Sequence, residues 1–109
     1  MSEEREVPAG RFGVGQLVEH QLFGYRGVVV DVDATFQLTE EWYREVARSR
    51  PPRDRPWYHV LVDGGEHMTY VAEQNLEADT SELPVTHPWL GRFFDRFSSG
   101  RYHRSDSLH

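Results

Sequence analysis

The sequence predicts a mainly β protein, a small barrel of about five strands that carries an inserted helix and a short helix near its C-terminus. Two pairs of β-like runs, each joined by a glycine-containing turn, predict two β-hairpins. A helix-capping residue and a proline-rich stretch between the hairpins predict the insertion. With 109 residues and 38% hydrophobic content, the chain can bury one modest core, so we expect one folded domain.

The first hairpin is predicted within residues 12–33, which read FGVGQLVEHQLFGYRGVVVDVD. Gly24 permits the positive backbone angle that a short hairpin loop needs. After Gly27 the side chains follow the two-residue period of a strand. Gly27 itself, inside a strand pattern, indicates a bulge or a sharp bend, and small barrels are built from strands bent in this way.

The second hairpin is predicted from WYHVLVD at 57–63 and HMTYVAE at 67–73, which flank the turn signal Gly64-Gly65. Both faces of the first run carry apolar groups, so we expect both faces to be at least partly covered. A short strand or turn around Leu76 brings the number of strands to about five, which a small closed or half-closed barrel needs.

A helix is predicted near residues 39–49, between the two hairpins. Thr39 can cap its first turn, which carries the acidic residues that a helix N-terminus favours. Three prolines in RPPRDRP at 50–56 then end the helix and keep the chain extended. A second helix is predicted near 88–97, because aromatic side chains recur there at four-residue spacing and could dock on the barrel or on another subunit.

These elements define one domain over residues 12–97. Residues 1–11, whose end is marked by Pro8 and Gly10, are expected to form a disordered arm, and residues 98–109 a flexible tail. The acidic, polar start and the lack of a long apolar run predict no membrane segment. The absence of cysteine fits a cytoplasmic location.

The charge distribution limits the nucleic-acid hypothesis. The net charge of −6 argues against strong nonspecific DNA binding, because phosphate contacts require clustered cations. All twelve basic residues are nonetheless arginine, which suits bidentate phosphate contacts. We take Arg26, Arg53 and Arg55 as candidate phosphate-binding residues. The alternative is that the clustered arginines form a solvated linker face.

Residues that could perform catalysis are sparse. The six histidines lack the close paired spacing of zinc sites. Asp31 and Asp33 share one strand face and could support acid–base chemistry or hold a hard cation; the alternative is that the strand reaches solvent there. Without a phosphate-binding loop, a nucleophile elbow or a recognisable triad, we predict no enzymatic activity, no metal and no cofactor.

Aromatic residues are the stronger candidates for binding. Phe23 and Tyr25 in the first turn, and Trp57 at the start of the third strand, could gather at one rim of the barrel. There they would stack on a base, hold a methylated group or contact an exposed apolar peptide. Core packing is the alternative for each of them.

Three blocks of sequence, FGVGQLVEHQLFGYRGVVVDVD, PWYHVLVD and TYVAEQNL, resemble the HspQ family, also called the hemimethylated DNA-binding or YccV-like family. The resemblance covers about residues 12–78, and ELPVTHPWLGRFF with GRY looks like an extension seen in one branch of that family. It implies a small SH3-like β-barrel without enzymatic activity. It also implies an association with hemimethylated DNA and with heat-shock proteolysis through the Lon protease.

These two implied activities have different requirements. Reading one methyl group in duplex DNA needs an apolar contact in the major groove and cations on the flanking phosphates. A protease adaptor needs a protein-binding surface, which an acidic barrel can provide. We therefore expect a stress regulator that binds a Lon-type protease and its client proteins, with homo-oligomer formation and binding of hemimethylated duplex DNA left open. The alternatives are a dedicated hemimethylated-DNA reader and a generic Tudor/KOW-like interaction module.

Overall fold

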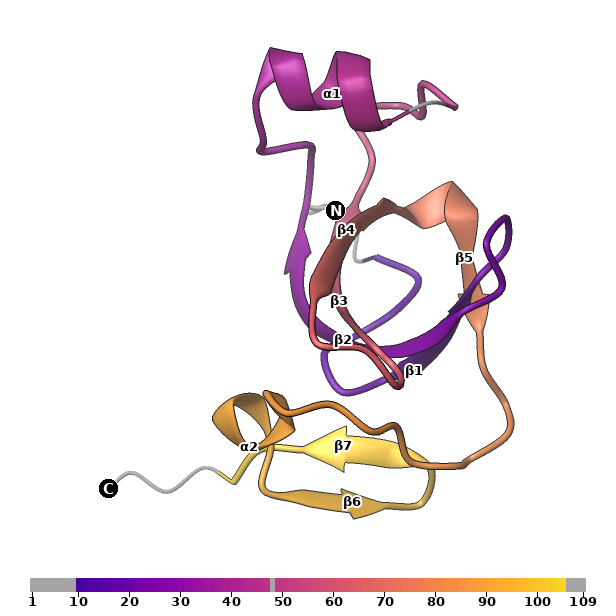
Figure 1. Ribbon diagram of the computed structural model, residues 1–109, viewed down its shortest axis with the longest axis vertical. Helices are drawn as coiled ribbons and strands as arrows, with labels where there is room; N and C mark the ends of the chain where they lie inside the picture. Colours follow the sequence, from indigo (N-terminus) through magenta and orange to yellow (C-terminus); the bar gives the residue numbers. More distant parts are fainter. Residues whose placement is uncertain (1–9, 48, 106–109) are drawn as a thin grey trace, which may run out of the picture.

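The protein is mainly β, as predicted, and its strands form two antiparallel sheets (Figure 1). The computed structural model describes residues 10–47 and 49–105. The larger sheet has the order β4-β3-β2-β1-β5. Its strands are β1 (Leu17–His20), β2 (Arg26–Asp33), β3 (Trp57–Val62), β4 (Met68–Ala72) and β5 (Leu76–Ala78). The remaining elements are the helices α1 (Glu40–Val46) and α2 (Leu90–Phe93), the 3-10 helix η1 (Glu73–Asn75), and the smaller sheet of β6 (Arg96–Ser98) and β7 (Arg101–His103).

The five-stranded sheet is strongly curled (Figure 1). Its two edge strands, β4 and β5, are joined only by η1, so the sheet bends back on itself. A register shift between Val29 and Asp31 places a β-bulge in β2, and bulges bend a strand. The sequence pattern predicts the bulge or bend at Gly27, two residues before the observed shift. That glycine instead allows β2 and β3 to approach closely, because a Cβ there would lie 2.5 Å from the Leu61 carbonyl oxygen.

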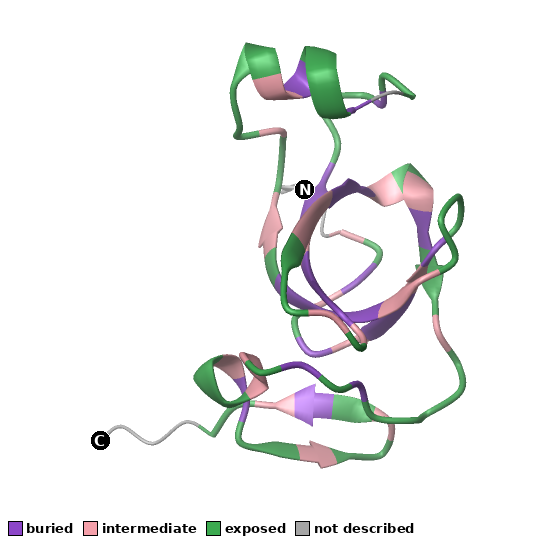
Figure 2. Ribbon diagram, in the orientation of Figure 1, coloured by how far each residue is buried: buried purple, intermediate pink, exposed green. Residues whose placement is uncertain are grey.

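Both faces of the curled sheet are covered, as the apolar pattern of residues 57–63 predicts, and Figure 2 shows the buried residues following its strands. The interior face packs the cluster Phe12, Val18, Val29, Tyr58, Val60, Val71 and Leu76. On the other face, a second cluster joins Leu17, Val28, Val30 and Leu61 to the C-terminal residues Val85, Phe94 and Tyr102. The C-terminal segment is therefore part of the packed structure.

Helix α1 forms where the capping signal predicts it. The Thr39 hydroxyl accepts a hydrogen bond from the Trp42 backbone N–H at 3.0 Å, and Glu40 and Glu41 occupy the first turn. Tyr43 fixes the helix to the proline-rich segment, because its hydroxyl donates to the Pro51 carbonyl at 2.7 Å. Among the described residues, no helix has the length and apolar character that crossing a bilayer requires.

The C-terminal region differs from the predicted helix over 88–97 and flexible tail from 98. Helix α2 has only four residues, and β6 and β7 form a hairpin. The turn residues Ser99 and Gly100 both have positive φ, 55° and 72°, which a tight hairpin turn favours. Phe97 pairs with Tyr102 across the hairpin, with ring centroids 4.6 Å apart. The spaced aromatics therefore reach one core from a helix turn and a strand.

The predicted N-terminal arm and the end of the predicted tail fall mostly outside the described residues. Residues 1–9 of the arm and 106–109 of the tail are not described. At the described end of the arm, the Arg11 backbone N–H donates to the Glu73 carboxylate at 2.9 Å.

Candidate functional site

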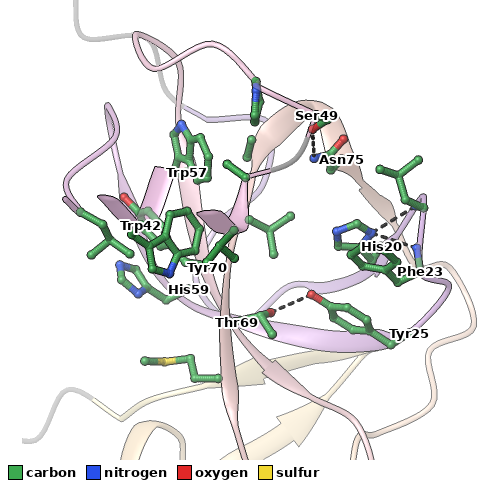
Figure 3. A pocket seen from close by; sticks show the side chains of 18 of the residues that line it. His20, Phe23, Tyr25, Trp42, Ser49, Trp57, His59, Thr69, Tyr70 and Asn75 are labelled. Carbon is green, nitrogen blue, oxygen red and sulfur yellow. Dashed lines mark hydrogen bonds between the residues drawn. The ribbon is translucent and has the colours of Figure 1, made fainter. Parts of the chain in front are cut away.

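A groove lined by aromatic side chains lies between α1, β4 and the turn that joins β1 to β2 (Figure 3). Its volume is about 730 Å³, within the range of small-ligand and peptide pockets. All five residues of β4 line it. The α1 side contributes Leu38, Trp42, Glu45 and Val46. We call this cavity the aromatic groove.

The aromatic groove gathers most of the large hydrophobic side chains that the described residues expose. Seven large hydrophobic side chains are exposed among the described residues. Five of the seven line the groove: Leu22, Phe23, Leu38, Val46 and Met68. Single exposed apolar residues are ordinary, but a contiguous group marks an interaction site. Phe23 is the most exposed of the five, at 75%.

The turn between β1 and β2 holds Phe23 in this exposed position. The Nδ1 atom of His20 accepts hydrogen bonds from the backbone N–H groups of Leu22 and Phe23, both at 3.1 Å. The His20 ring stacks on the Phe23 ring with centroids 4.6 Å apart. Burial lowers the pKa of His20, which favours the neutral imidazole that these two bonds require. The turn is therefore an ordered platform for Phe23.

The opposite wall of the groove consists of Trp42, Trp57 and Tyr70 (Figure 3). The Tyr70 ring stacks on Trp57 at 5.2 Å and meets Trp42 nearly edge-on at 5.7 Å. The Tyr70 hydroxyl donates to the Asp33 carboxylate at 2.7 Å and accepts from the Gln37 N–H at 3.1 Å. Burial, and then the bond to Asp33, raise the pKa of Tyr70. The ring is thus fixed at both its face and its hydroxyl.

The three predicted aromatic residues all line this groove, but they are not equally accessible. Phe23 is exposed, and Tyr25 is half-buried with its hydroxyl 2.7 Å from that of Thr69. Trp57 is only 1% exposed, and its Nε1 donates to the Pro52 carbonyl at 3.1 Å. Trp57 therefore supports the wall from behind, in the core position that was the alternative for this residue.

Sequence reasoning did not select Trp42 as a site residue. It lies on the apolar side of α1, and nothing local indicates where that helix docks. Its partial burial in the third cluster, beside Trp57 and Tyr70, comes from contacts between distant segments. The signal that could have found it was the presence of a tryptophan on a short, otherwise acidic helix.

Two of the three predicted phosphate-binding arginines are engaged by the protein itself. The Arg26 guanidinium donates to Asp79 at 2.7 Å and Asp63 at 3.1 Å, and also to the Leu83 carbonyl. Arg53 makes a bidentate pair with Glu40 at 2.7 and 2.6 Å. Its guanidinium also lies 3.8 Å from the centre of the Tyr43 ring.

The third predicted arginine, Arg55, is exposed and borders a smaller hollow with Arg11 and Glu73. The aromatic groove has a different charge. Among the described residues that line it, none is arginine, and Glu45 carries the one formal charge at neutral pH. The structure therefore separates the aromatic surface from the predicted phosphate contacts.

Asp31, Asp33 and His59 form the group of described residues that could hold a metal ion. One ligand atom from each lies within 4.8 Å of the others. Oxygen and imidazole donors suit a divalent cation. The Asp33 Oδ2 atom, however, already accepts from Tyr70 and lies 3.2 Å from the His59 Nε2. The predicted aspartate pair thus meets a histidine from β3, while the prediction of no metal stays a prediction.

Comparison with known families extends these observations. The family model described as "Hemimethylated DNA-binding protein YccV like" matches residues 10–101. The match includes both hairpins of the large sheet, α1, and the C-terminal segment up to the start of β7. It therefore reaches beyond residues 12–78, where the sequence blocks carry the resemblance, into the segment that forms the second core. The chain belongs to the YccV-like family of hemimethylated DNA-binding proteins.

Proposed function

We propose that this protein is a non-enzymatic stress regulator of the HspQ type, which holds apolar segments of protein partners in the aromatic groove and so modulates Lon-type proteolysis. In this proposal the curled sheet is an SH3-like barrel that stays open between β4 and β5. The carrying observation is that, of the seven large hydrophobic side chains that residues 10–47 and 49–105 expose, five surround one groove. Such surfaces bury apolar area when a partner binds.

The charge of the groove favours a protein partner over DNA. Binding to the DNA backbone requires cations beside the reading surface. The described lining of the groove contains no arginine, and Arg26 and Arg53 are paired with carboxylates of the protein. The net charge of −6 also repels phosphate. An apolar peptide segment needs no cations beside the groove, and the net negative charge does not repel it.

The adaptor proposal is tested by capture of the Lon protease from a purified mixture. Phe23→Ala removes the most exposed apolar side chain of the groove, and we expect it to weaken capture at least tenfold. The matched control is Leu83→Ala, because Leu83 is 60% exposed but does not line the groove. Equal capture by the protein and by both variants, with the fold intact by circular dichroism, would reject the proposal.

A second candidate function is recognition of hemimethylated duplex DNA, and the family match favours it. Phe23 and Tyr25 would contact the methyl group, while Arg55 would contact phosphate. Fluorescence anisotropy with matched unmethylated, hemimethylated and fully methylated duplexes tests this across a salt series. Selective binding to the hemimethylated duplex that weakens with salt would establish a DNA reader. Binding that ignores methylation, or does not change with salt, would exclude it.

A further inference from the structure

We propose that the aromatic groove receives its partner as an added β-strand, an extended segment of alternating apolar and arginine residues that hydrogen-bonds to the free edge of β4. This inference rests on the proposed protein-binding function and specifies the chemistry of the partner. Strand addition to an exposed sheet edge is a recurrent mode of peptide recognition, in which main-chain bonds give affinity and alternate side chains give specificity.

The main-chain groups of β4 that point away from β3 can be identified from the ends of the ladder. The Val62 N–H donates to the His67 carbonyl at 3.3 Å, and the Glu73 N–H donates to the Pro56 carbonyl at 3.1 Å. Hydrogen-bonded pairs alternate along an antiparallel ladder, so Thr69 and Val71 direct their main-chain groups toward β3. The main-chain groups of the intervening residues point outward: Met68, Tyr70 and Ala72.

These outward groups have no ladder partner in the described structure. β4 is the last strand in the sheet order, so among the described residues these groups bond to no neighbouring strand. The Ala72 carbonyl differs from the others because Ala72 is the N-cap residue of η1, where it accepts the first bond of that helix. The strand reads MTYVA, without the charged residue or proline that commonly protects an edge from pairing. All five of its residues line the aromatic groove, so the free edge runs along the groove itself.

The two faces of β4 specify what an added strand would carry. On one face, Thr69 contacts the Tyr25 hydroxyl, and Tyr25 packs against the interior cluster that contains Val71. On the other face, Tyr70 meets Trp42. Figure 3 shows the group of His20, Phe23 and Tyr25 across the groove from that of Trp42, Trp57 and Tyr70.

Side chains of an added strand alternate between these two faces. On the first face they would meet Phe23 and Tyr25, which suits aliphatic residues. On the second they would meet the rings of Trp42 and Tyr70 beside the Glu45 carboxylate, which suits arginine through cation–π and ionic contacts. Among the described residues, Glu45 forms no ion pair with a cationic side chain.

The test uses a fluorescent, capped peptide of sequence VRVRVRV and two backbone N-methylated forms, one methylated on the valines and one on the arginines. In an added strand, only one of these two sets of N–H groups faces β4. We expect one methylated form to bind at least tenfold more weakly and the other to change less than threefold. A peptide with glutamate in place of arginine should also lose at least tenfold. Equal effects of the two methylation patterns, or equal binding of the glutamate peptide, would overturn the inference.

A protein variant tests the same edge from the other side. Met68→Pro removes an outward N–H but no bond to β3, so we expect it to fold and to lose peptide binding. Amide hydrogen exchange should show Met68, Tyr70 and Ala72 protected by the peptide. If Met68→Pro does not fold, this exchange measurement on the unmutated protein decides. Protection of the three amides without peptide, rising with protein concentration, would show a second copy on the edge and overturn the inference.

The result can be separated from that of the proposed function. If Phe23→Ala abolishes Lon capture while the two methylated peptides bind equally, the groove binds partners by side chains alone and only strand addition fails. If the peptides distinguish the two patterns while Phe23→Ala leaves Lon capture unchanged, strand addition stands and the Lon-adaptor function fails.

Discussion

Replacing Arg26 with methionine removes a guanidinium that joins three segments of the chain. Arg26 lies at the start of β2 and reaches Asp63 in the turn after β3 and Asp79 after β5. Its Nη2 also donates to Ser81 and Leu83, in the connection toward the C-terminal hairpin. We expect the free energy of unfolding to fall by about 2–3 kcal/mol, because methionine keeps much of the aliphatic stem and loses the polar contacts.

The magnitude follows from the geometry and burial of these bonds. A hydrogen bond to a charged group contributes about 1.5–3 kcal/mol, and two such bonds, at 2.7 and 3.1 Å, join Arg26 to carboxylates. The Arg26 and Asp63 side chains are 23% and 29% exposed, so water replaces part of what is lost. We therefore expect a loss below the roughly 3–6 kcal/mol that two fully buried bonds would give. A loss of about 2–3 kcal/mol lowers the melting temperature by roughly 10–15 °C in a domain of this size.

The pH dependence gives this prediction a second observable. Burial alone would raise the pKa of Asp79, but hydrogen bonds from Arg26 and Ser81 outweigh it and lower the pKa below its usual value. A carboxyl with a lowered pKa in the folded state contributes stability above its unfolded pKa, near 3.9, and this contribution is lost as the pH falls through the folded value. The difference between the protein and Arg26→Met should be full at pH 7 and shrink below about pH 4.

Urea unfolding followed by tryptophan fluorescence measures this difference, with Arg44→Met as the control. Arg44 is exposed on α1 and forms no ion pair with another described residue, so its replacement should change stability by less than about 0.5 kcal/mol. A loss below about 0.5 kcal/mol for Arg26→Met at pH 7 would refute the reasoning. A loss that stays constant down to pH 2 would show that ionised carboxylates do not carry it.

Three further measurements test other parts of the structure. The His20 pKa, lowered by burial, should titrate below 6.5 by NMR, and groove binding should weaken as the pH falls from about 6.5 toward 5, because protonation removes the Nδ1 acceptor. Gly15→Ala should lower the free energy of unfolding in urea by about 2–4 kcal/mol, because φ is +93° and a Cβ would lie 2.1 Å from the Tyr102 carbonyl oxygen. Gly64→Ala should lower it by only about 1–2 kcal/mol, because φ is +80° but no atom lies near the added Cβ. Burial, and then its bond to a carboxylate, raise the pKa of Tyr58 to about 12, so Tyr58→Phe should remove a tyrosine titration near pH 12 and cost roughly 1–2 kcal/mol.

Each of these expectations has a clear contrary result. A His20 pKa at or above 6.5 would mean that the turn does not require the neutral ring. Equal losses for Gly15→Ala and Gly64→Ala would mean that backbone strain alone, without the contact to Tyr102, accounts for the cost. An unchanged tyrosine titration in Tyr58→Phe would mean that its hydroxyl is not held by the carboxylate.

The elements that depend on local signals were predictable from the sequence. Gly24 and the Gly64-Gly65 pair mark the two turns of the large sheet, and Thr39 marks the start of α1. Each signal acts within a few residues, so no knowledge of distant packing is needed. The position of the β-bulge was not predictable, because a glycine inside a strand pattern, such as Gly27, is compatible both with a bend and with a close contact between strands.

The C-terminal hairpin was missed because the spacing of the aromatic residues there fits one longer helix as well as a helix turn followed by a strand. Trp89, Phe93 and Phe97 fit a helix, but Phe97 reaches the same core from β6. The Ser99-Gly100 dipeptide was the available turn signal. Phe23 and Tyr25, which their turn indicated as site residues, line the aromatic groove, and their role in binding stays a prediction. The pairing of Arg26 was not, since its acidic partners lie 37 and 53 residues away along the chain.

The burial of both faces of β2 links the C-terminal hairpin to the evolution of the rest of the domain. Leu17, Val28, Val30 and Leu61 face the hairpin side, whereas Val29 and Val60 face the interior of the curl. A relative that lacks the hairpin would present the first four positions to water and would need polar side chains there, while the two interior valines could stay as they are. Insertion or loss of this hairpin therefore requires several substitutions together on the sheet face that the hairpin covers. The residues on the opposite, interior face need not change.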